Sequence, residues 1–450
     1  MTMSRMPKTT RRTFLQSTGA SALCLGFAGN APAWVPHTVL GQTPPSDRIV
    51  IGHIGLGWRG FELVRQTFRN PNLRIAAVAD LDLAFLMKRL QFLDDQASID
   101  RPWIKGEGWD CLPAPTPAGG VDPYLDYRYL LDRQDIDAVV IAVPDHWHAK
   151  TYIDALDAGK DVYGEKPLTL TINQGRAVVR KVQETGRVFQ TGLQQRSDPL
   201  FRTACEYVRN GRLGTLKRIR ILIRGTNVID PVPDAPVPPG LDWDRWLGPA
   251  PKVPYNPLRS HVTFRWFWDY SGGQITDLGA HHADIAQWAL GMDRSGPRKI
   301  EGFARTRPGA YETYTDYDIR LTYENGVVLT FESIPDFDMI FEGEKGEIFV
   351  NRGVIKSTPE DILKEPLTSS DERLPVSDNH MQNWVDCIRS RALPLTDVET
   401  GHRTATVCHL ANIFGMIQRP LEWDPVREVF VNDPEANQYL ERPQREPYAI

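Results

Sequence analysis

The chain has 450 residues, of which 41% are hydrophobic and 24% are charged, so it is long enough to bury a large core in two domains. Its formal net charge of -5 gives no general attraction to nucleic acid, and we expect no nucleic-acid partner. The five cysteines show no C-x-x-C spacing, which argues against a thiolate zinc site and against a disulfide framework.

The N-terminus carries a basic pair in front of a modestly apolar run. Arg11 and Arg12 begin this segment, and Ala31-Pro32-Ala33 ends it with an A-x-A cleavage pattern. The paired arginines resemble the signal read by the twin-arginine export machinery, which implies a periplasmic or otherwise exported protein. We therefore expect residues 1–33 to form a signal peptide and residues 34–47 to form a linker.

The apolar run has two other interpretations. A membrane anchor is disfavoured because the run is too short and too rich in glycine and alanine to span a bilayer. Lipid attachment at Cys24 is disfavoured because Leu23 is larger than the residue that a lipoprotein signal prefers at that position.

The segment after the linker has the pattern of a dinucleotide-binding unit. An apolar strand, RIVIGHI, leads into Gly55, Gly57 and Gly60, spaced as G-x-G-x-x-G, and a helical pattern follows. A second strand, LRIAAVADLD, reaches Asp80 at its end. This spacing, set between a strand and a helix and followed by an acid after the next strand, indicates a dinucleotide site. A glycine-rich turn without a ligand is the alternative.

Each residue of this pattern has its own physical role. Gly55 permits a tight turn, Gly57 lets a pyrophosphate approach the backbone, and Gly60 allows close packing of the helix. The same turn is expected to bring Trp58 and Arg59, which lie between these glycines, beside the cofactor. A carboxylate at Asp80 accepts hydrogen bonds from a ribose 2′-hydroxyl and repels a 2′-phosphate, so the expected cofactor is NAD, with NADP as the alternative.

Further along the chain, strands and helices alternate until about residue 168. Residues 83–123 are expected to form an irregular surface insertion, and strands follow at 138–143 and in the stretch DVYGEK. The fold class is therefore α/β: a Rossmann domain with a doubly wound parallel sheet, residues 48–168. Residues 169–450 are expected to form an α+β substrate and oligomerisation domain with a large, mainly antiparallel sheet and a C-terminal tail.

The stretch GGQITDLGAHHADIAQW, residues 272–288, places two histidines side by side on a predicted helix. Asp277 and His281 are four residues apart and share one face, whereas His282 is turned away from it. A carboxylate and an imidazole so placed can hold a substrate hydroxyl and remove its proton. The alternative for His281 is a buried histidine satisfied by Asp284 or by backbone, and for His282 packing is favoured.

Three motifs in this order resemble the glucose-fructose oxidoreductase / inositol dehydrogenase / MocA family. They are the glycine turn at 55–60, Glu165-Lys166-Pro167, and GGQITDLGAHHAD. In the last motif, the four fixed positions of the family pattern D-x-G-x-H-x-x-D are occupied by Asp277, Gly279, His281 and Asp284. The resemblance covers nearly all of the chain after the signal peptide. It implies the catalytic set Lys166, Asp277 and His281, with Glu165 at the cofactor and a cis peptide bond before Pro167.

The resemblance also implies roles for two loops. Pro144, His146 and His148 would lie beside the nicotinamide ribose, the alternative being helix capping by Asp145. Arg196 would lie near the substrate, the alternative being a solvated arginine. From the residues alone, the aromatic stretch RWFWDY suggests that Trp268 stacks on a sugar ring, although core packing explains it nearly as well.

Together these features predict an exported NAD(P)-dependent oxidoreductase that oxidises a secondary hydroxyl of a sugar or cyclitol-like substrate. The cofactor is expected to stay bound, because little free cofactor is available outside the cytoplasm, and a homo-oligomer is expected. Alternatives are coupled oxidation and reduction of two sugars, an NAD-dependent glycosidase or lyase working through a transient keto-sugar, and a non-catalytic dinucleotide-binding sensor. A metal enzyme using His281, His282 and Asp284 is a further rival, but no metal is expected, because adjacent histidines on a helix point apart.

Overall fold

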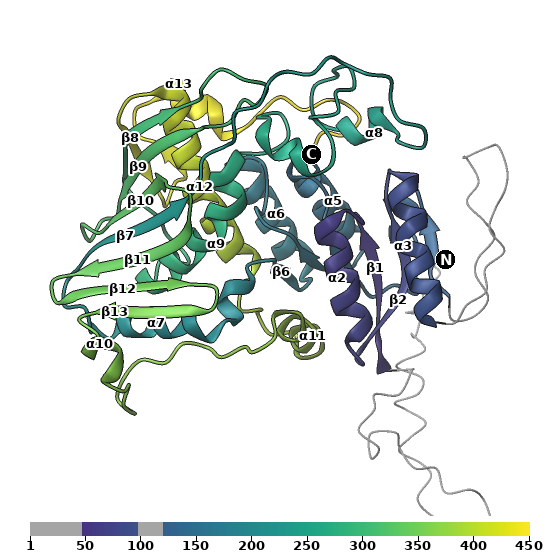
Figure 1. Ribbon diagram of the computed structural model, residues 1–450. Helices are drawn as coiled ribbons and strands as arrows, with labels where there is room; N and C mark the ends of the chain where they lie inside the picture. The colour runs from purple at the N-terminus through teal and green to yellow at the C-terminus, as the bar shows by residue number, and fades with distance from the viewer. Residues whose placement is uncertain (1–46, 98–119) are drawn as a thin grey trace, which may run out of the picture. The chain divides into compact units, whose positions relative to one another are not determined.

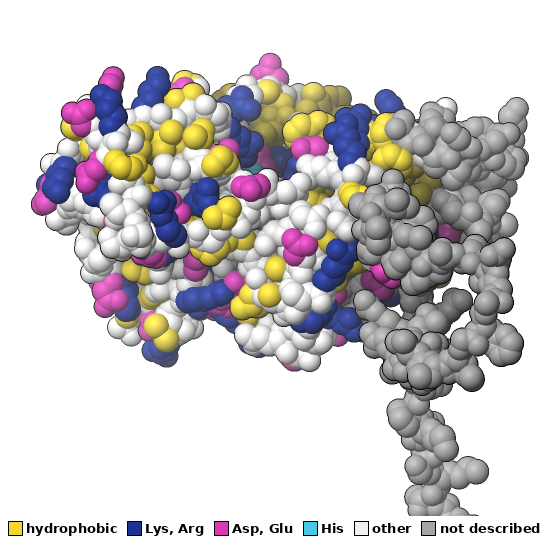
Figure 2. Space-filling view, turned by 90° about the horizontal axis from the view of Figure 1, so that it is seen from below, with side chains coloured by type: hydrophobic (Ala, Val, Ile, Leu, Met, Phe, Trp, Pro, Cys, Tyr) yellow, Lys and Arg dark blue, Asp and Glu magenta, His cyan; other side chains and the backbone are white. Residues whose placement is uncertain are grey.

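The computed structural model describes residues 47–97 and 120–450, which form two β-sheets with helices packed on them (Figure 1). The predicted signal peptide and the linker up to residue 46 lie outside the described residues. Among the helices that are described, none combines the length and the apolar character needed to cross a membrane. Basic and acidic side chains are mixed over the face that Figure 2 shows.

The N-terminal sheet is parallel and doubly wound. Its strand order is β3-β2-β1-β4-β5-β6, so the chain winds from β1 toward one edge and then from β4 toward the other. All neighbouring strands pair in parallel, which confirms the predicted Rossmann architecture. The strands are β1 (Ile49–Ile54), β2 (Leu73–Ala79), β3 (Asp122–Tyr124), β4 (Ala138–Ile141), β5 (Asp161–Gly164) and β6 (Phe189–Thr191). The helices are α2 (Trp58–Arg69), α3 (Leu83–Ala97), α4 (Tyr127–Leu131), α5 (Asp145–Asp157) and α6 (Ile172–Thr185).

Local sequence explains why these elements form where they do. β4 reads AVVI and is buried along its whole length, as expected for a parallel strand covered on both faces. α6 begins where the Thr171 side chain accepts a hydrogen bond from the backbone N–H of Gln174, and it ends at Gly186 in the left-handed conformation. The carboxyl ends of β1, β4 and β5 consequently open at one edge, where ligands of such sheets bind.

The C-terminal sheet has nine strands and is mainly antiparallel, as predicted. Its order is β13-β12-β11-β7-β10-β9-β8-β14-β15, with β7 and β10 parallel to each other. The helices α7, α9 and α12 pack together, and α9 packs on β7 (Figure 1). The strands are β7 (Leu216–Ile223), β8 (Lys299–Arg305), β9 (Asp316–Thr322), β10 (Val328–Ser333), β11 (Phe337–Gly343), β12 (Gly346–Asn351), β13 (Val354–Thr358), β14 (Leu421–Asp424) and β15 (Val429–Phe430). The helices are η3 (Gln194–Ser197), α7 (Pro199–Arg209), α8 (Trp243–Leu247), η4 (His261–Trp266), α9 (Gly273–Leu290), α10 (Asp361–Lys364), α11 (His380–Ser390), α12 (Val398–Ile417), α13 (Pro434–Asn437) and η5 (Gln438–Leu440).

Two expectations about the first domain differ from the structure. The irregular insertion expected at 83–123 begins instead with α3, because leucines recur there every three or four residues and pack on β2. The parallel sheet also continues beyond residue 168, where the sequence placed its end, because β6 pairs with β5. The glycine- and proline-rich remainder of the insertion, residues 98–119, lies outside the described residues.

The glycine turn after β1 yields a prediction for stability. A Cβ at Gly60 would stand 2.0 Å from the carbonyl oxygen of Gly55, whereas a Cβ at Gly57 would meet no heavy atom within 4 Å. Gly60→Ala should therefore lower the free energy of unfolding by about 1–3 kcal/mol, because α2 must move off β1. Gly57→Ala, the matched control, should unfold at nearly the wild-type urea concentration. Equal stability of both variants would contradict this account, because it would show that α2 can accommodate a methyl group at residue 60.

Candidate functional site

A cavity of about 810 Å³ opens at the carboxyl edge of the parallel sheet and is also lined by α9, η4 and the β12–β13 turn. Its volume lies in the range of small-molecule and cofactor sites. The structure brings most of the predicted site residues to this one cavity. Those lining it are Gly55, Gly57, Trp58, Arg59, Asp80, Pro144, His148, Glu165, Lys166, Asp277 and His281.

The glycine turn provides the shape that a pyrophosphate needs. Gly55 has a φ of 86°, and a Cβ there would lie 2.4 Å from the carbonyl oxygen of Ala142, so only glycine fits the turn. The space above Gly57 is open, at the start of α2. Backbone N–H groups at a helix start attract phosphate, so this part of the cavity fits a dinucleotide.

Asp80 follows β2 and faces the same cavity. Its carboxylate accepts hydrogen bonds from the backbone N–H of Leu56 at 2.6 Å and of Asp82 at 2.8 Å. Burial raises the pKa of Asp80 to about 6, although these two backbone hydrogen bonds favour the ionised form. A carboxylate has more acceptor positions than these two bonds use, so Asp80 retains the capacity to accept from a ribose hydroxyl.

Lys166 and Asp277 form an ion pair across the cavity. The Lys166 ammonium lies 2.5 Å from Oδ1 of Asp277 and 3.0 Å from its backbone oxygen, and Arg265 approaches the same carboxylate at 3.3 Å. Burial alone would favour the neutral acid, but these two cations hold the pKa of Asp277 well below its ordinary value. Asp277 is therefore ionised and fixes the direction of Lys166.

The turn that carries Lys166 is held from behind. The Lys166–Pro167 peptide bond is cis, as predicted. The His148 ring lies with Nδ1 2.7 Å from the carbonyl oxygen of Pro167 and Nε2 2.9 Å from that of Val143. At least one of these contacts must be a donated N–H, so His148 ties the Lys166 turn to the loop after β4. His148 thus lines the cavity and positions its lysine.

His281 and His282 have different surroundings. His281 lines the cavity, and its Nδ1 is buried without a hydrogen-bond partner among the described residues. Burial, together with the charges of Lys166 and Arg352, holds the pKa of His281 well below its usual range, so the imidazole is neutral. His282 instead stacks on Phe337 at 4.2 Å between ring centroids. The two rings thus face different surroundings, as the helix periodicity predicts: His281 lines the cavity and His282 packs on Phe337.

Glu165 and Arg59 form an ion pair in the wall of the cavity. The Arg59 Nε lies 2.7 Å from Oε1 of Glu165, and the Gln194 amide donates to the same oxygen at 3.2 Å. Gly192 packs against this carboxylate so closely that a Cβ there would stand 2.8 Å from Oε1. Arg59 keeps a buried Nη2 without a partner among the described residues, so it retains a donor for a ligand.

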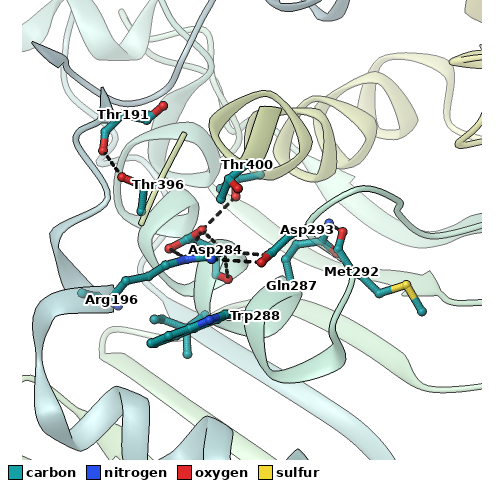
Figure 3. A network of polar contacts seen from close by, with 12 residues as sticks. Thr191, Arg196, Asp284, Gln287, Trp288, Met292, Asp293, Thr396 and Thr400 are labelled. Atoms are coloured by element: carbon teal, nitrogen blue, oxygen red, sulfur yellow. Dashed lines mark hydrogen bonds and ion pairs between the residues drawn. The ribbon is translucent and has the colours of Figure 1, made fainter. Parts of the chain in front are cut away.

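Arg196 does not contact this cavity, contrary to the prediction. Its guanidinium is almost fully buried and pairs with Asp284 at 2.7 Å and with Asp293 at 2.7 Å (Figure 3). It also lies over the Trp288 ring, 5.1 Å from the centroid. Asp284 accepts a further hydrogen bond from Thr404. Arg196 therefore joins the α9 helix to its neighbours as a structural residue, because both of its carboxylate partners lie behind the catalytic face.

Two further residues that were expected at the site do not line the cavity. His146 packs between the rings of Trp246 and Tyr270, and its Nε2 lies 2.9 Å from the Trp246 carbonyl oxygen, so it is buried away from the cavity lining. Trp268 packs on Tyr314 and donates its indole N–H to the carbonyl oxygen of Glu312. Core packing thus explains Trp268.

Several lining residues were not predicted. Arg265 and Trp266 end η4 and face the cavity, and Arg352 enters it from the β12–β13 turn. Asp145 accepts a 2.5 Å hydrogen bond from Ser271, which ties the start of α5 to the segment just before α9. The sequence gives a signal for Arg265 and Trp266, which both belong to the stretch RWFWDY. The other contacts join segments far apart in the chain.

Fold and site together define a class of protein: a dinucleotide-dependent oxidoreductase whose Rossmann domain and α/β domain line one cavity with a lysine, an aspartate and a histidine. Residues 116–193 match the NAD-binding Rossmann fold of the Gfo/Idh/MocA oxidoreductase family, and residues 225–450 match the C-terminal alpha/beta domain of the same family. The chain therefore belongs to this family, and the expected cofactor, NAD, is that of the matching domain.

Known proteins resemble the chain at moderate identity. Scyllo-inositol 2-dehydrogenase (NAD(+)) from Bacillus subtilis (strain 168) is 27% identical over 302 residues, which cover 62% of this chain and 76% of that protein. A glycosyl hydrolase family 109 protein from Shewanella sp. (strain MR-4) is 30% identical over 186 residues, which cover 39% of this chain and 37% of that protein. The crystal structure of the WlbA dehydrogenase from Bordetella pertussis, in complex with NADH and UDP-GlcNAcA, shares the fold with a TM-score of 0.60 and 16% identity, over 84% of this chain and 99% of that chain.

The raised pKa of Asp80 predicts how NAD binding depends on pH. Hydrogen bonds to an ionised group exceed neutral ones by about 1 kcal/mol, so NAD affinity should fall about 5-fold as the pH drops through 6 and the carboxylate is protonated. Calorimetric titration of cofactor-free protein between about pH 5 and pH 8 measures this change. Asp80→Asn should bind NAD weakly with a flat profile. A wild-type profile as flat as that of the variant would contradict the assignment.

Proposed function

We propose that this protein is an exported oxidoreductase that uses tightly held NAD to oxidise a secondary hydroxyl of a sugar or cyclitol-like substrate. One observation carries the proposal: Lys166, Asp277 and His281 converge in the cavity that also contains the glycine turn. The similarity to scyllo-inositol 2-dehydrogenase supports a polyhydroxylated ring as substrate.

Lys166, His281 and Asp277 have different roles at the substrate hydroxyl. NAD, when bound, supplies the acceptor for the hydride. The Lys166 ammonium, held by Asp277, donates a hydrogen bond to the hydroxyl oxygen and stabilises negative charge that develops there. The neutral imidazole of His281 lines the same cavity and accepts the hydroxyl proton. The ionised Asp277 keeps Lys166 in place without competing for that proton.

A second candidate is an NAD-dependent glycosidase or lyase that forms a keto-sugar transiently and then returns the hydride. The similarity to the glycosyl hydrolase family 109 protein favours it, although the matched segment spans only about a third of that protein. The two candidates differ in their products. An oxidoreductase leaves an oxidised sugar and reduced cofactor, whereas the glycosidase releases the leaving group with no net reduction.

Export is the third part of the proposal and rests on Arg11-Arg12 and Ala31-Pro32-Ala33, which lie outside the described residues. Replacing both arginines by lysine should leave folded protein in the cytoplasm, as the twin-arginine machinery requires the pair. Fractionation of expressing cells measures this, and periplasmic recovery of the double variant would contradict it. We also propose a homo-oligomer, which light scattering of the mature protein would test.

The two adjacent histidines provide the sharpest test of the catalytic assignment. His281→Ala should lower the rate of hydride transfer by about 10²- to 10⁴-fold, because the proton acceptor is lost. His282→Ala is the matched control: it should leave this rate nearly unchanged while losing stability, because the His282 ring packs on Phe337. Stopped-flow reduction of bound NAD measures the step apart from product release. A slower His282→Ala and a normal His281→Ala would overturn the assignment.

A further inference from the structure

The two halves of the cavity wall differ in charge. The wall formed by residues before 200 carries six carboxylates together with basic groups, and these belong to the cofactor side. The wall formed by residues after 200 carries four arginines and a single carboxylate, Asp277. Asp277 is already engaged by Lys166 and Arg265, and Arg245 pairs with Asp242 at 3.4 Å. Two arginines of this wall, Arg224 and Arg352, consequently face the cavity without a carboxylate partner.

Arg224 follows directly after the last residue of β7. Its side chain lines the cavity, is exposed to solvent, and makes no hydrogen bond or ion pair with any of the residues that the structure describes. Its backbone, by contrast, is anchored, because the Tyr317 hydroxyl donates to the Arg224 carbonyl oxygen at 3.0 Å. The guanidinium is thus a free donor group on a fixed support.

Arg352 reaches the cavity from the β12–β13 turn. Its Nε donates to the side-chain oxygen of Gln195 at 3.2 Å, and the guanidinium lies 4.9 Å over the Phe337 ring. No ion pair to Arg352 is formed within the described part of the chain. Burial and the charge of Arg59 lower the pKa of Arg352, and the carboxylates of Asp198, Glu62 and Asp277 offset this only in part, without pairing with it.

Sheet register brings these two arginines to the same end of the C-terminal sheet. Ile223, the neighbour of Arg224, pairs with Phe337 of β11, and Arg352 covers that same phenylalanine. Arg224 is the next residue after this strand pair, and both arginines line the same cavity. His282, the residue after His281, stacks on the same phenylalanine. This end of the sheet therefore lies close to the proposed proton acceptor. An anionic group held by the arginines would therefore lie near the reacting hydroxyl.

We propose that the substrate of this site carries an anionic group, a carboxylate or a phosphate, which Arg224 and Arg352 bind while Lys166 and His281 engage the hydroxyl. This inference rests on the proposed oxidation of a sugar or cyclitol hydroxyl and names its substrate class. Arginine suits the role because its planar fork of donors matches the oxygens of either anion.

The charge balance around His281 agrees with this substrate class. The cations Lys166 and Arg352 both lower the pKa of His281, which makes it a weak proton acceptor in the free protein. A bound anion next to Arg352 would offset that cation and favour the protonated imidazole. By raising the pKa of His281, an acidic substrate would make the neutral imidazole a stronger proton acceptor.

The test uses NAD-loaded full-length protein and matched forms of one hexose. Calorimetric titration with glucose, glucuronate and glucose 6-phosphate, and with the galactose equivalents, compares neutral, carboxylate and phosphate forms. At least one anionic form should bind about 10-fold or more tightly than its neutral partner, as hydrogen bonds to charged groups contribute that much. The form that gains identifies whether the anion is a carboxylate or a phosphate.

Arg224→Gln and Arg352→Gln should each weaken binding of the anionic form about 10-fold and leave the neutral sugar unaffected. Arg320→Gln on β9, where the arginine is exposed and pairs with Asp318, is the matched control and should change neither. Equal binding of neutral and anionic sugars, or unchanged binding in both variants, would overturn the proposal. So would a loss of NAD affinity in both variants without loss of the anionic sugar, since the arginines would then serve the cofactor.

Failure of this inference and failure of the proposed function give different results. If neutral sugars reduce the bound NAD as efficiently as their acidic forms, the anionic subsite is wrong and the oxidoreductase stands. If anionic sugars bind tightly through the two arginines but none reduces the cofactor, the subsite stands and the oxidation is wrong.

Discussion

The ion pair between Lys166 and Asp277 joins the two halves of the molecule at the place where chemistry is expected. Lys166 follows β5 of the parallel sheet, and Asp277 lies in the second turn of α9, which packs on the other sheet. Removing one partner of such a largely buried pair typically costs about 3–5 kcal/mol, because the other charge is left uncompensated. The pair therefore fixes the direction of the lysine and the distance of His281 from the Rossmann edge together.

Other contacts also fix the positions of Lys166 and of α9. His148 ties the turn that carries Lys166 to the loop after β4, and Ser271 ties the start of α9 to Asp145, the first residue of α5. The Arg196 network holds the far side of α9 through Asp284 (Figure 3). Each of these buried polar groups is satisfied by a partner from a different segment, so the catalytic face of α9 is held from both sides.

Much of the fold could be predicted because its signals are local. The alternation of buried strands with helices and the glycine turn lie within short stretches, and they define the parallel sheet. The end of that sheet was misplaced because β6 is recognised only through its pairing with β5, which the sequence does not display. The helix α3 is hard to predict because its leucine pattern runs directly into a glycine- and proline-rich stretch, which is typical of irregular structure.

The expected site residues line one cavity where they share one element or one turn, as for Asp277 with His281 and Gly55 and Gly57 with Arg59. The sequence does not predict a contact that depends on which face of the fold a side chain meets. Arg196 follows a strand of the parallel sheet, as a ligand-binding residue would, yet two carboxylates behind α9 hold it. Arg352 gave no signal at all, because only the pairing of β11 and β12 brings its turn to the cavity.

The central claim is that a hydride leaves the substrate carbon for the cofactor while Lys166 and His281 act on the attached hydroxyl. It is tested most directly by tracing deuterium from a sugar labelled at that carbon, with mass spectrometry of the cofactor released from the protein. The account predicts that the label appears on the nicotinamide ring in wild-type protein and stays on the sugar in the His281→Ala variant. Loss of the label to water, with none on the cofactor, would contradict it.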